Sequence, residues 1–240
     1  NSNSQLMSSG VTNALEVSAG NKHSLVLKDN GTVIAFGNND YGQCNIPSDL
    51  NNVITVSAGE NHSIGLLAGG IVRAWGRNHS GQANVPSTLL GYQSGNNGAI
   101  SIKAGNNHSL ALRGDGTVLA WGAAEASAVP ANLTKVREIA AGNRFSLALK
   151  ENGDVVSWGN GYGASVPADL KDVVSIAANN DHVVALQVDG AVTGWGKVYD
   201  GTNYANLADT MPPNLNSGIG VFAGKDHGAI LKSDGSLLVF

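Results

Sequence analysis

The chemistry that the sequence first suggests is nucleophilic hydrolysis. Residues 104–122, AGNNHSLALRGDGTVLAWG, place His108 beside Ser109, and Asp115 follows seven residues after the histidine. Serine, histidine and aspartate are the residue types of a hydrolase triad, in which the histidine takes the serine proton and the aspartate orients the ring. This hypothesis requires that the combination of these three residues occur once in the chain.

The same stretch occurs six times, which argues against an active site. Its copies begin at Ala19, Ala58, Ala104, Ala141, Ala178 and Ala223. Internal repetition at this period is typical of propellers, solenoids and other arrays. An enzyme needs one nucleophile rather than six, and Phe145 replaces the histidine in the fourth copy. We therefore interpret the His-Ser pairs as structural, and we expect neither catalysis nor a metal at them, since zinc ligands come in closely spaced pairs.

Three positions define the repeat: a histidine slot, a glycine eight residues later, and an aromatic residue five residues after that. The histidine slots are His23, His62, His108, Phe145, His182 and His227. The dipeptide that ends in the glycine is Asn-Gly, Asp-Gly or Gly-Gly, which suits the positive φ of a type I′ turn between antiparallel strands. Each copy is therefore predicted to contain a β-hairpin, preceded by a third strand such as residues 53–59. A short fourth strand is expected at CNIPS (residues 44–48) and ANVPS (residues 83–87), since proline suits an edge strand.

Three or four antiparallel strands in a unit of about 40 residues are typical of a propeller blade. We expect an all-β fold: a six-bladed β-propeller, with blades of mostly four strands, that forms one domain over residues 1–240. The segment from Asn1 to His23 matches one connector in length. Residues 1–10 are therefore predicted to join the last blade and close the ring, which removes open sheet edges. A β-solenoid, and a propeller that has lost a seventh blade, stay open as alternatives.

The repeat resembles that of a known family. The pattern AG-x-x-H-S-x-A-L, followed by x-G-x-V-x-x-W-G and G-Q-x-x-x-P, is similar to the repeat of the regulator of chromosome condensation family over essentially the whole chain. The short units, such as AWGRNHSGQANVP from Ala74, look most like those of bacterial propeller-type β-lactamase inhibitor proteins. The resemblance implies a propeller, usually of seven blades, that binds proteins through a loop face. Nucleotide exchange on a small GTPase, known in eukaryotic members, depends on insertions not found here and is not expected.

Composition excludes several classes of function. The formal net charge is −4 and the 14 Lys and Arg residues are scattered, so nucleic acid is not an expected partner. No apolar stretch reaches the roughly 18 residues of a membrane span. Cys44 is the only cysteine, so no internal disulfide can form. Abundant Asn, Ser and Gly favour a secreted or surface-associated bacterial protein, which we expect to be a monomer without cofactors or bound metal.

The segments after each Trp-Gly pair differ most between copies, and we expect binding there. Loops on a rigid scaffold commonly carry function, and tyrosine and arginine often anchor interfaces. Residues 197–213 form one of the two longest connectors and are predicted to lie at the centre of the binding face. The candidate residues on this loop face are Asp40, Tyr41, Arg77, His79, Tyr162, Tyr199, Asp200 and Tyr204.

These observations predict a non-catalytic module that binds an unidentified folded protein, in the manner of an inhibitor, an adhesin or a toxin-associated domain. A carbohydrate-binding, lectin-like propeller is the alternative, because Asn, Asp and aromatic side chains also line glycan sites. Lectin sites in a ring would repeat with the blades, whereas these loops differ in length and content. That difference favours one protein-binding face, and an enzyme is not expected.

Overall fold

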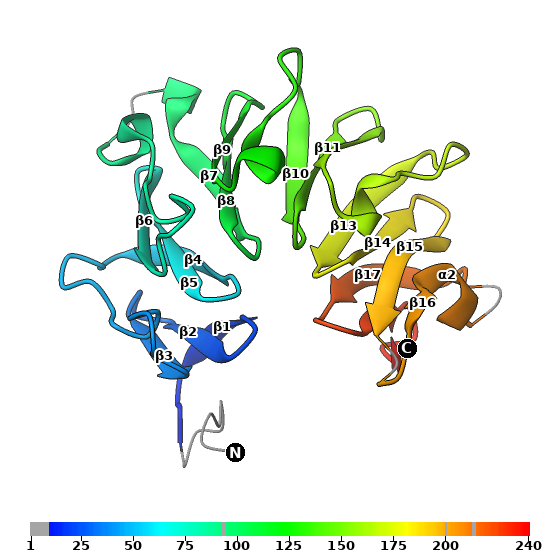
Figure 1. The fold of residues 1–240 in the computed structure, drawn as a ribbon, viewed down its shortest axis with the longest axis horizontal. Coiled ribbons are helices and arrows are strands. Elements are labelled where there is room, and N and C mark those ends of the chain that lie inside the picture. The colour runs from blue at the N-terminus through cyan, green and yellow to red at the C-terminus, as the bar shows by residue number, and fades with distance from the viewer. Residues whose placement is uncertain (1–9, 93–94, 200, 213–214) are drawn as a thin grey trace. The chain divides into compact units, whose positions relative to one another are not determined.

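The computed structural model describes residues 10–92, 95–199, 201–212 and 215–240. Within these residues, short strands form six antiparallel sheets, five of three strands and one of four (Figure 1). The all-β prediction is therefore confirmed, with one small sheet for each repeat. The chain divides into two compact units, residues 1–129 and residues 130–240. The single domain expected over residues 1–240 stays a prediction.

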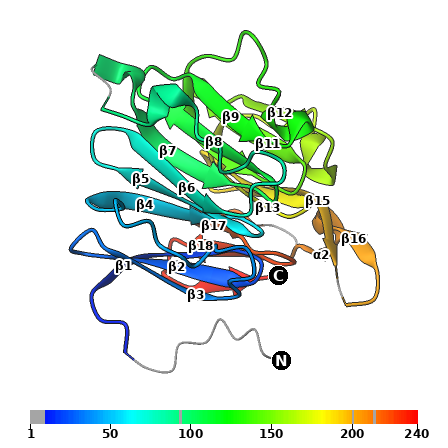
Figure 2. The ribbon, with the colours of Figure 1, turned by 60° about the vertical axis from the view of Figure 1, so that its left-hand side comes forward.

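The first unit holds the sheets of the first three repeats, which lie face to face (Figure 2). Their strands are β1 (Ala14–Ala19), β2 (His23–Lys28), β3 (Val33–Gly37), β4 (Val53–Ala58), β5 (His62–Leu67), β6 (Ile71–Gly76), β7 (Ala99–Ala104), β8 (His108–Arg113) and β9 (Val118–Gly122). The helical turns are η1 (Ser87–Leu89), η2 (Gly95–Asn97) and α1 (Ala124–Ser127). Each sheet packs on the next through apolar side chains, as where Leu25 and Leu27 of β2 share a core with Val53 and Val56 of β4.

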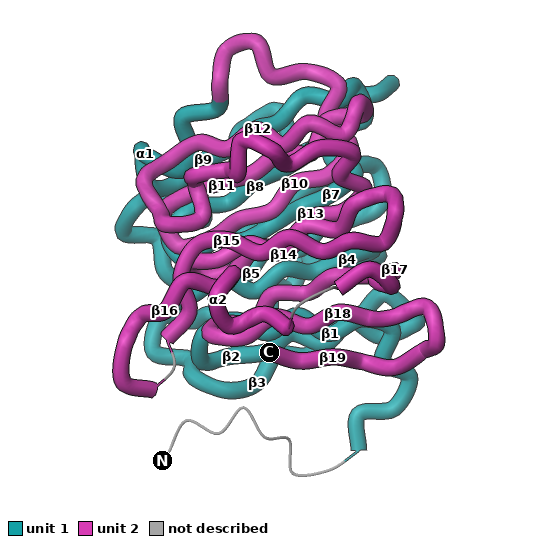
Figure 3. Tube along the Cα trace, turned by 90° about the vertical axis from the view of Figure 1, so that its right-hand side faces the viewer, with its two compact units in different colours: residues 1–129 teal, residues 130–240 magenta. Residues whose placement is uncertain are grey.

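The second unit holds the sheets of the last three repeats (Figure 3). Its strands are β10 (Val136–Ala141), β11 (Phe145–Lys150), β12 (Val155–Gly159), β13 (Val173–Asn179), β14 (His182–Gln187), β15 (Val192–Tyr199), β16 (Tyr204–Asn206), β17 (Gly218–Ala223), β18 (Gly228–Lys232) and β19 (Leu237–Val239). The helical turns are η3 (Tyr162–Ala164) and α2 (Leu207–Thr210). Strand β15 is long enough to pair with β16 as well as β14, which makes this the sheet of four strands.

The hairpin predicted in each repeat is confirmed, but the type I′ turn is wrong. In the first repeat, the Lys28 N–H donates to the Thr32 carbonyl (2.9 Å) and the Gly31 N–H donates to the Lys28 carbonyl (3.0 Å). Gly31 has a positive φ of 76°, whereas Asn30 is not left-handed, so the loop has three residues and ends in a glycine bulge. Asn30 Oδ1 accepts the Thr32 N–H at 3.1 Å, as in an Asx turn. The residue before the glycine is therefore selected as a hydrogen-bond acceptor.

The same acceptor role recurs in four other repeats, at Asp115, Asn152, Asp189 and Asp234. The turn glycine is also needed for packing, because it contacts the next repeat. The Val53 N–H donates to the Gly31 carbonyl (3.2 Å), and a Cβ on Gly31 would lie 3.3 Å from Asn52 Cα. A side chain at this position would therefore crowd the neighbouring strand as well as require a strained φ.

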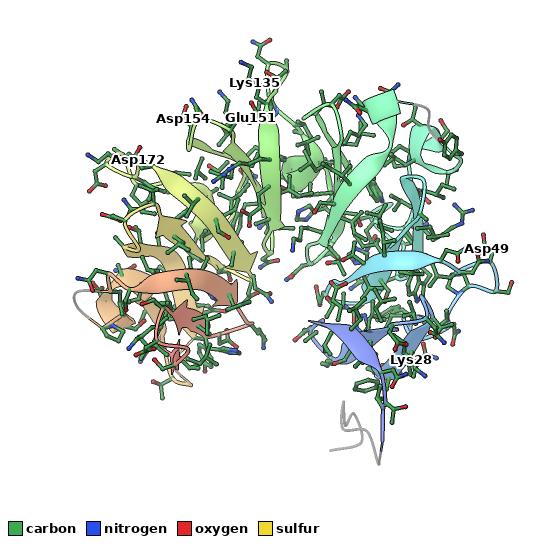
Figure 4. The ribbon with its side chains drawn as sticks, turned by 180° about the vertical axis from the view of Figure 1, so that it is seen from behind. Lys28, Asp49, Lys135, Glu151, Asp154 and Asp172 are labelled. Atoms are coloured by element: carbon green, nitrogen blue, oxygen red, sulfur yellow. The ribbon has the colours of Figure 1, made fainter. Side chains whose placement is uncertain are left out.

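Lys135 has a backbone conformation that is unfavourable for lysine. Its φ is 56°, close to the 53° of Asn52 and of Asp172 at the equivalent places before β4 and β13. Figure 4 labels Lys135 and Asp172. Asn and Asp tolerate the left-handed region better than other side chains. Lys135→Asn is therefore expected to raise the free energy of unfolding by about 0.5–1 kcal/mol, as measured by urea denaturation. The exposed Lys171 lacks this conformation, so Lys171→Asn is the control; equal stability of all three proteins would contradict the argument.

The predicted fourth strand is wrong for residues 44–48 and 83–87, which form turns and irregular backbone. The Asn45 N–H donates to the Gly42 carbonyl (3.0 Å), and Asn39 Nδ2 donates to Asn45 Oδ1 (2.8 Å). Polar groups of this segment thus find partners inside the loop rather than along a strand. Blades of mostly four strands are accordingly corrected to sheets of mostly three.

Ring closure by the N-terminal segment concerns residues that, apart from Gly10, lie outside the described part of the chain, and it stays a prediction. No helix among the described residues combines the length and the apolar character needed to cross a bilayer.

Candidate functional site

The repeated His-Ser pairs lie in the core and join adjacent repeats. His23 Nε2 lies 2.9 Å from Ser63 Oγ, and His62 Nε2 lies 2.9 Å from Ser109 Oγ. Each bond therefore links the histidine of one repeat to the serine of the next. All four side chains are fully buried. This geometry agrees with the structural interpretation of the pairs, because a buried hydroxyl is out of reach of a substrate.

Asp115, which completes the residue types of a triad, serves the hairpin turn instead. Its carboxylate accepts hydrogen bonds from the Thr117 N–H (2.9 Å) and the Thr117 hydroxyl (2.5 Å), and it lies 3.6 Å from the Arg113 guanidinium. Strand β8 begins at His108 and ends at Arg113, so Asp115 lies beyond the opposite end of the strand from the histidine. The three residues do not form a triad.

Each bridging serine donates its hydroxyl hydrogen bond to a carbonyl oxygen. This bond determines which ring nitrogen of the histidine is the donor. Ser63 Oγ donates to the Gln43 carbonyl (2.9 Å), and Trp75 Nε1 donates to the same oxygen (2.9 Å). A hydroxyl has one proton, so His23 must donate from Nε2 and carry its lone pair on Nδ1. Nδ1 of His23 is buried and has no hydrogen-bond partner. The bridge therefore suits the neutral imidazole, because a protonated Nδ1 would be a buried donor without an acceptor.

Burial opposes the charging of these rings. Desolvation lowers the pKa of His23 to about 4 and that of His108 to about 4. The pKa of His62 falls to about 3, through desolvation and then through repulsion from the other two histidines. Desolvation also lowers the pKa of His182, whose Nε2 donates to the His227 carbonyl at 3.2 Å. A second proton would place a charge and an unpaired N–H in the core.

The fourth repeat replaces this polar bridge by an apolar one. Phe145 occupies the histidine slot, Val183 occupies the serine slot of the next repeat, and both are fully buried in one core. Gly163 takes the place of Gln43: its carbonyl accepts Trp195 Nε1 at 2.8 Å, and a Cβ on it would collide with the Phe145 ring. Three positions thus differ together, so that a phenyl ring fits where a polar network stands elsewhere.

In the first unit, four predicted site residues gather on two neighbouring loops, and we call them the Tyr41 cluster: Asp40, Tyr41, Arg77 and His79. The Arg77 guanidinium lies 5.1 Å from the centre of the Tyr41 ring, which is a cation–π contact. The Tyr41 and His79 rings meet edge to face with centroids 6.1 Å apart, and Arg77 Nε lies 3.4 Å from His79 Nδ1. Asp40 accepts a hydrogen bond from Asn38 Nδ2 (2.7 Å).

In the second unit, three predicted tyrosines and one lysine form a surface that we call the tyrosine face: Tyr162, Lys197, Tyr199 and Tyr204. Tyr199 and Tyr204 are paired across β15 and β16 with ring centroids 5.4 Å apart. Lys197 lies on the same side of β15 as Tyr199, two residues earlier, and its Nζ lies 4.6 Å from the centre of the Tyr162 ring. The tyrosines are 42% to 56% exposed.

The long insertion that carries Lys197, Tyr199 and Tyr204 of this face is a braced hairpin rather than an open loop. Helix α2 follows β16, and its Leu207 is fully buried. A Cβ on Gly194 of β15 would collide with Met211 Sδ and lie 2.8 Å from Leu207 Cδ2, so the glycine lets the segment pack closely on the strand. The tyrosine face therefore stands on a fixed support.

The structure thus brings the predicted residues together in two groups, one in each unit. Asp200 lies outside the described residues. Lys197 is missing from the predicted set, although its spacing of two residues from Tyr199 would place both on one side of a strand. In the part of the chain that the structure describes, no three His, Cys, Asp or Glu side chains are grouped to hold a metal ion.

Comparison with known proteins identifies the repeat. The Regulator of chromosome condensation (RCC1) repeat matches residues 15–43, 53–82, 99–124 and 136–163, which cover the sheets of the first four repeats. Among curated protein sequences, none matches the chain.

Solved structures share the fold at low sequence identity. Yeast RCC1 (Prp20), in a complex with Kap60, is 20% identical with a TM-score of 0.69, over 95% of this chain and 69% of that chain. Human WBSCR16 is 20% identical with a TM-score of 0.70, over 93% and 75% of the two chains. The CRINKLY WD40 ectodomain of the Arabidopsis thaliana receptor kinase ACR4 is 18% identical with a TM-score of 0.69, over 95% and 79%. The chain thus has four segments that match the RCC1 repeat, and its six small antiparallel sheets match the architecture of RCC1 propellers.

Proposed function

We propose that this protein is a non-catalytic module that binds a folded protein through the tyrosine face. The observation that carries the proposal is the pair of exposed tyrosines, Tyr199 and Tyr204, on a braced hairpin. The half-buried Lys197 of the same hairpin connects them to the exposed Tyr162 of η3. Tyrosine offers a large amphipathic contact area with few rotatable bonds, so it loses little entropy on binding. Because α2 already holds the hairpin in place, little further ordering would be needed when a partner docks.

Related proteins support a protein partner. Yeast RCC1 (Prp20) occurs in a structure bound to Kap60, and its reported binding properties concern Gsp1p and histones. RCC1-like propellers are commonly protein-binding modules, and this is the class to which we assign the chain. The likeness to β-lactamase inhibitor proteins, a bacterial source and secretion are further parts of the proposal, as is the lack of an enzymatic activity, a cofactor and a nucleic-acid partner.

The test is to capture and identify the partner from the surroundings of the source organism, and then to measure its dissociation constant with purified components. Tyr199→Ala combined with Tyr204→Ala is expected to weaken binding by about a hundredfold or more, since an interface anchor contributes about 2 kcal/mol. Tyr92→Ala is the matched control, because Tyr92 is 77% exposed and lies outside the tyrosine face. It is expected to leave binding unchanged.

Two results would count against the proposal. Equal loss of binding in the Tyr92 variant and in the double variant would mean that the tyrosine face has no special role. Binding on a glycan array that depends on Tyr199, with no protein partner captured, would favour the carbohydrate-binding alternative.

A further inference from the structure

Arg77, in the Tyr41 cluster of the first unit, is held in place without a carboxylate partner among the described residues. Its guanidinium lies over the Tyr41 ring, 5.1 Å from the ring centre, and its Nε lies 3.4 Å from His79 Nδ1. Arg73 and Arg113 of the same unit are instead ion-paired with aspartates, at 2.8 and 3.6 Å. Neighbouring rings therefore orient the positive charge of Arg77, while the described residues leave it unpaired.

The remaining polar groups of Arg77 and His79 are hydrogen-bond donors. A guanidinium stays protonated and has no acceptor, so Arg77 Nε donates to His79 Nδ1. The neutral His79 ring therefore carries its proton on Nε2. The two Nη groups of Arg77 have no hydrogen-bond partner among the described residues. Together these groups can bind a ligand that supplies acceptors.

Asp40 precedes Tyr41 in the chain, but it is bonded to Asn38 rather than to Arg77. Its Oδ2 accepts a hydrogen bond from Asn38 Nδ2 (2.7 Å), and its N–H donates to Asn38 Oδ1 (3.3 Å). Asn38 Oδ1 also accepts a hydrogen bond from Nε2 of Gln43 (2.7 Å), which is fully buried. Gln43 Oε1 accepts the Tyr41 N–H (3.0 Å). One buried glutamine therefore fixes this loop and helps to keep the Asp40 carboxylate from pairing with Arg77.

The loop that carries Arg77 and His79 is fixed in the same way. Gln82 is fully buried, and its Oε1 accepts the Ser80 N–H (2.9 Å). The Arg77 N–H donates to the Asn61 carbonyl (2.9 Å). Because hydrogen bonds already hold both loops, little further ordering is needed when a ligand binds between them and solvent.

We propose that Arg77 binds a carboxylate group end-on, through its two Nη groups, and that this group belongs to an acidic side chain or to the C-terminus of a peptide. The spacing of the guanidinium N–H groups matches the two oxygens of a carboxylate. Tyr41 and His79 orient the guanidinium in advance, because they hold its face and its Nε. Asp40, next to Tyr41 in the chain, is exposed, and its charge opposes a doubly charged phosphate more than a carboxylate. The site does not involve the tyrosine face.

The test is an NMR titration of the full chain, in which the resonances of the His79 ring report binding at constant pH and ionic strength. The probes are tripeptides with acetylated N-termini: Gly-Glu-Gly amide, Gly-Gly-Gly with a free C-terminus, and Gly-Gln-Gly amide. The first two carry one carboxylate each, and at least one of them is expected to shift the resonances to saturation. The third has no carboxylate and is expected to leave them unchanged. The tighter of the first two identifies the source of the carboxylate.

Two variants separate the planar guanidinium from its charge. Arg77→Lys keeps the charge but removes the two-pronged contact, so the dissociation constant of the bound peptide is expected to rise about tenfold or more. Arg113→Lys is the matched control, because Arg113 already faces Asp115, and it is expected to bind like the wild type. Circular dichroism checks that each variant is folded.

Four results would overturn the proposal. They are wild-type resonances that neither carboxylate peptide shifts, equal binding by the wild type and Arg77→Lys, equal shifts with the Gln and Glu peptides, and tighter binding of inorganic phosphate than of either carboxylate peptide.

Discussion

The free energy of unfolding is expected to fall by about 1.4 kcal/mol per pH unit for each of His23, His62 and His108 as the pH is lowered from 6.5 towards 4. In the unfolded chain a histidine takes up a proton near pH 6.5, whereas burial in the folded state lowers the pKa of His23 and His108 to about 4 and that of His62 to about 3. Between these values the unfolded state binds more protons, so acid favours unfolding. Three such histidines together make the protein steeply acid-sensitive.

Urea denaturation at a series of pH values measures this slope. At the junction of His62, the Gln82 carbonyl has the place of the Gly163 carbonyl. Substitution of His62 by Phe, Ser109 by Val and Gln82 by Gly therefore copies Phe145, Val183 and Gly163, and it is expected to remove the contribution of one histidine to the slope. The pKa values of Asp49, Asp115 and Asp234 are also lowered in the folded state, but they affect the free energy of unfolding only at lower pH. The stability that such a carboxylate contributes is lost only as the pH falls towards its lowered pKa. A stability that is flat between pH 6.5 and pH 4 would contradict the prediction.

Phe145→His is expected to lower the free energy of unfolding by about 3 kcal/mol, because it leaves a cavity and a buried ring without a hydrogen-bond partner. Val183→Ser is expected to lower it by about 2 kcal/mol, since it removes apolar volume from the core and buries a hydroxyl whose oxygen has no donor. With both changes, the imidazole can donate to the hydroxyl and the hydroxyl to the Gly163 carbonyl. The double variant should therefore be more stable than the sum of the two losses by at least about 1 kcal/mol.

Unfolding of the four proteins of this double-mutant cycle gives the coupling directly. The control cycle combines Phe145→His with Val198→Ser, because Val198 is buried in a different core of the same unit. Those two losses are expected to add, since the side chains share no partner. Additive losses for Phe145 and Val183 as well would mean that the two slots are not coupled.

Much of the fold could be predicted from the sequence because the repeat shows its constraints six times. The glycine and aromatic slots predict one hairpin for each copy, and the apolar run before it predicts the third strand, as the structure confirms. The type of turn could not be predicted from the same pattern. Asn before Gly suits either a left-handed backbone or a hydrogen-bond acceptor in an Asx turn, and the hydrogen bonds of the folded chain determine which of the two forms. Residues 44–48 looked like an edge strand, but side-chain hydrogen bonds inside the loop prevail over weak strand propensity.

The candidate site was predictable only in part. The variable segments after each Trp-Gly pair correctly indicate where exposed tyrosines gather, since scaffold positions tolerate little change. Pairings such as Arg77 with Tyr41 and Lys197 with Tyr162 depend on loop paths that no local spacing encodes. The link between Phe145 and Val183 was visible in principle, because comparison of each histidine slot with the serine slot of the following copy shows both changing at one junction. Whether either group of residues binds a partner stays a prediction.

The shared bridges have a consequence for how such a chain can grow by duplication. Each bridge joins the histidine of one copy to the serine of the next. A duplicated segment therefore keeps both partners of a bridge only if it runs from the middle of one copy to the middle of the following one. A duplication with breakpoints at the copy boundaries next to Phe145 would set a phenyl ring against a serine, or an imidazole against a valine. Genetic breakpoints that keep Phe145, Gly163 and Val183 on one fragment are therefore the ones expected to leave a foldable product.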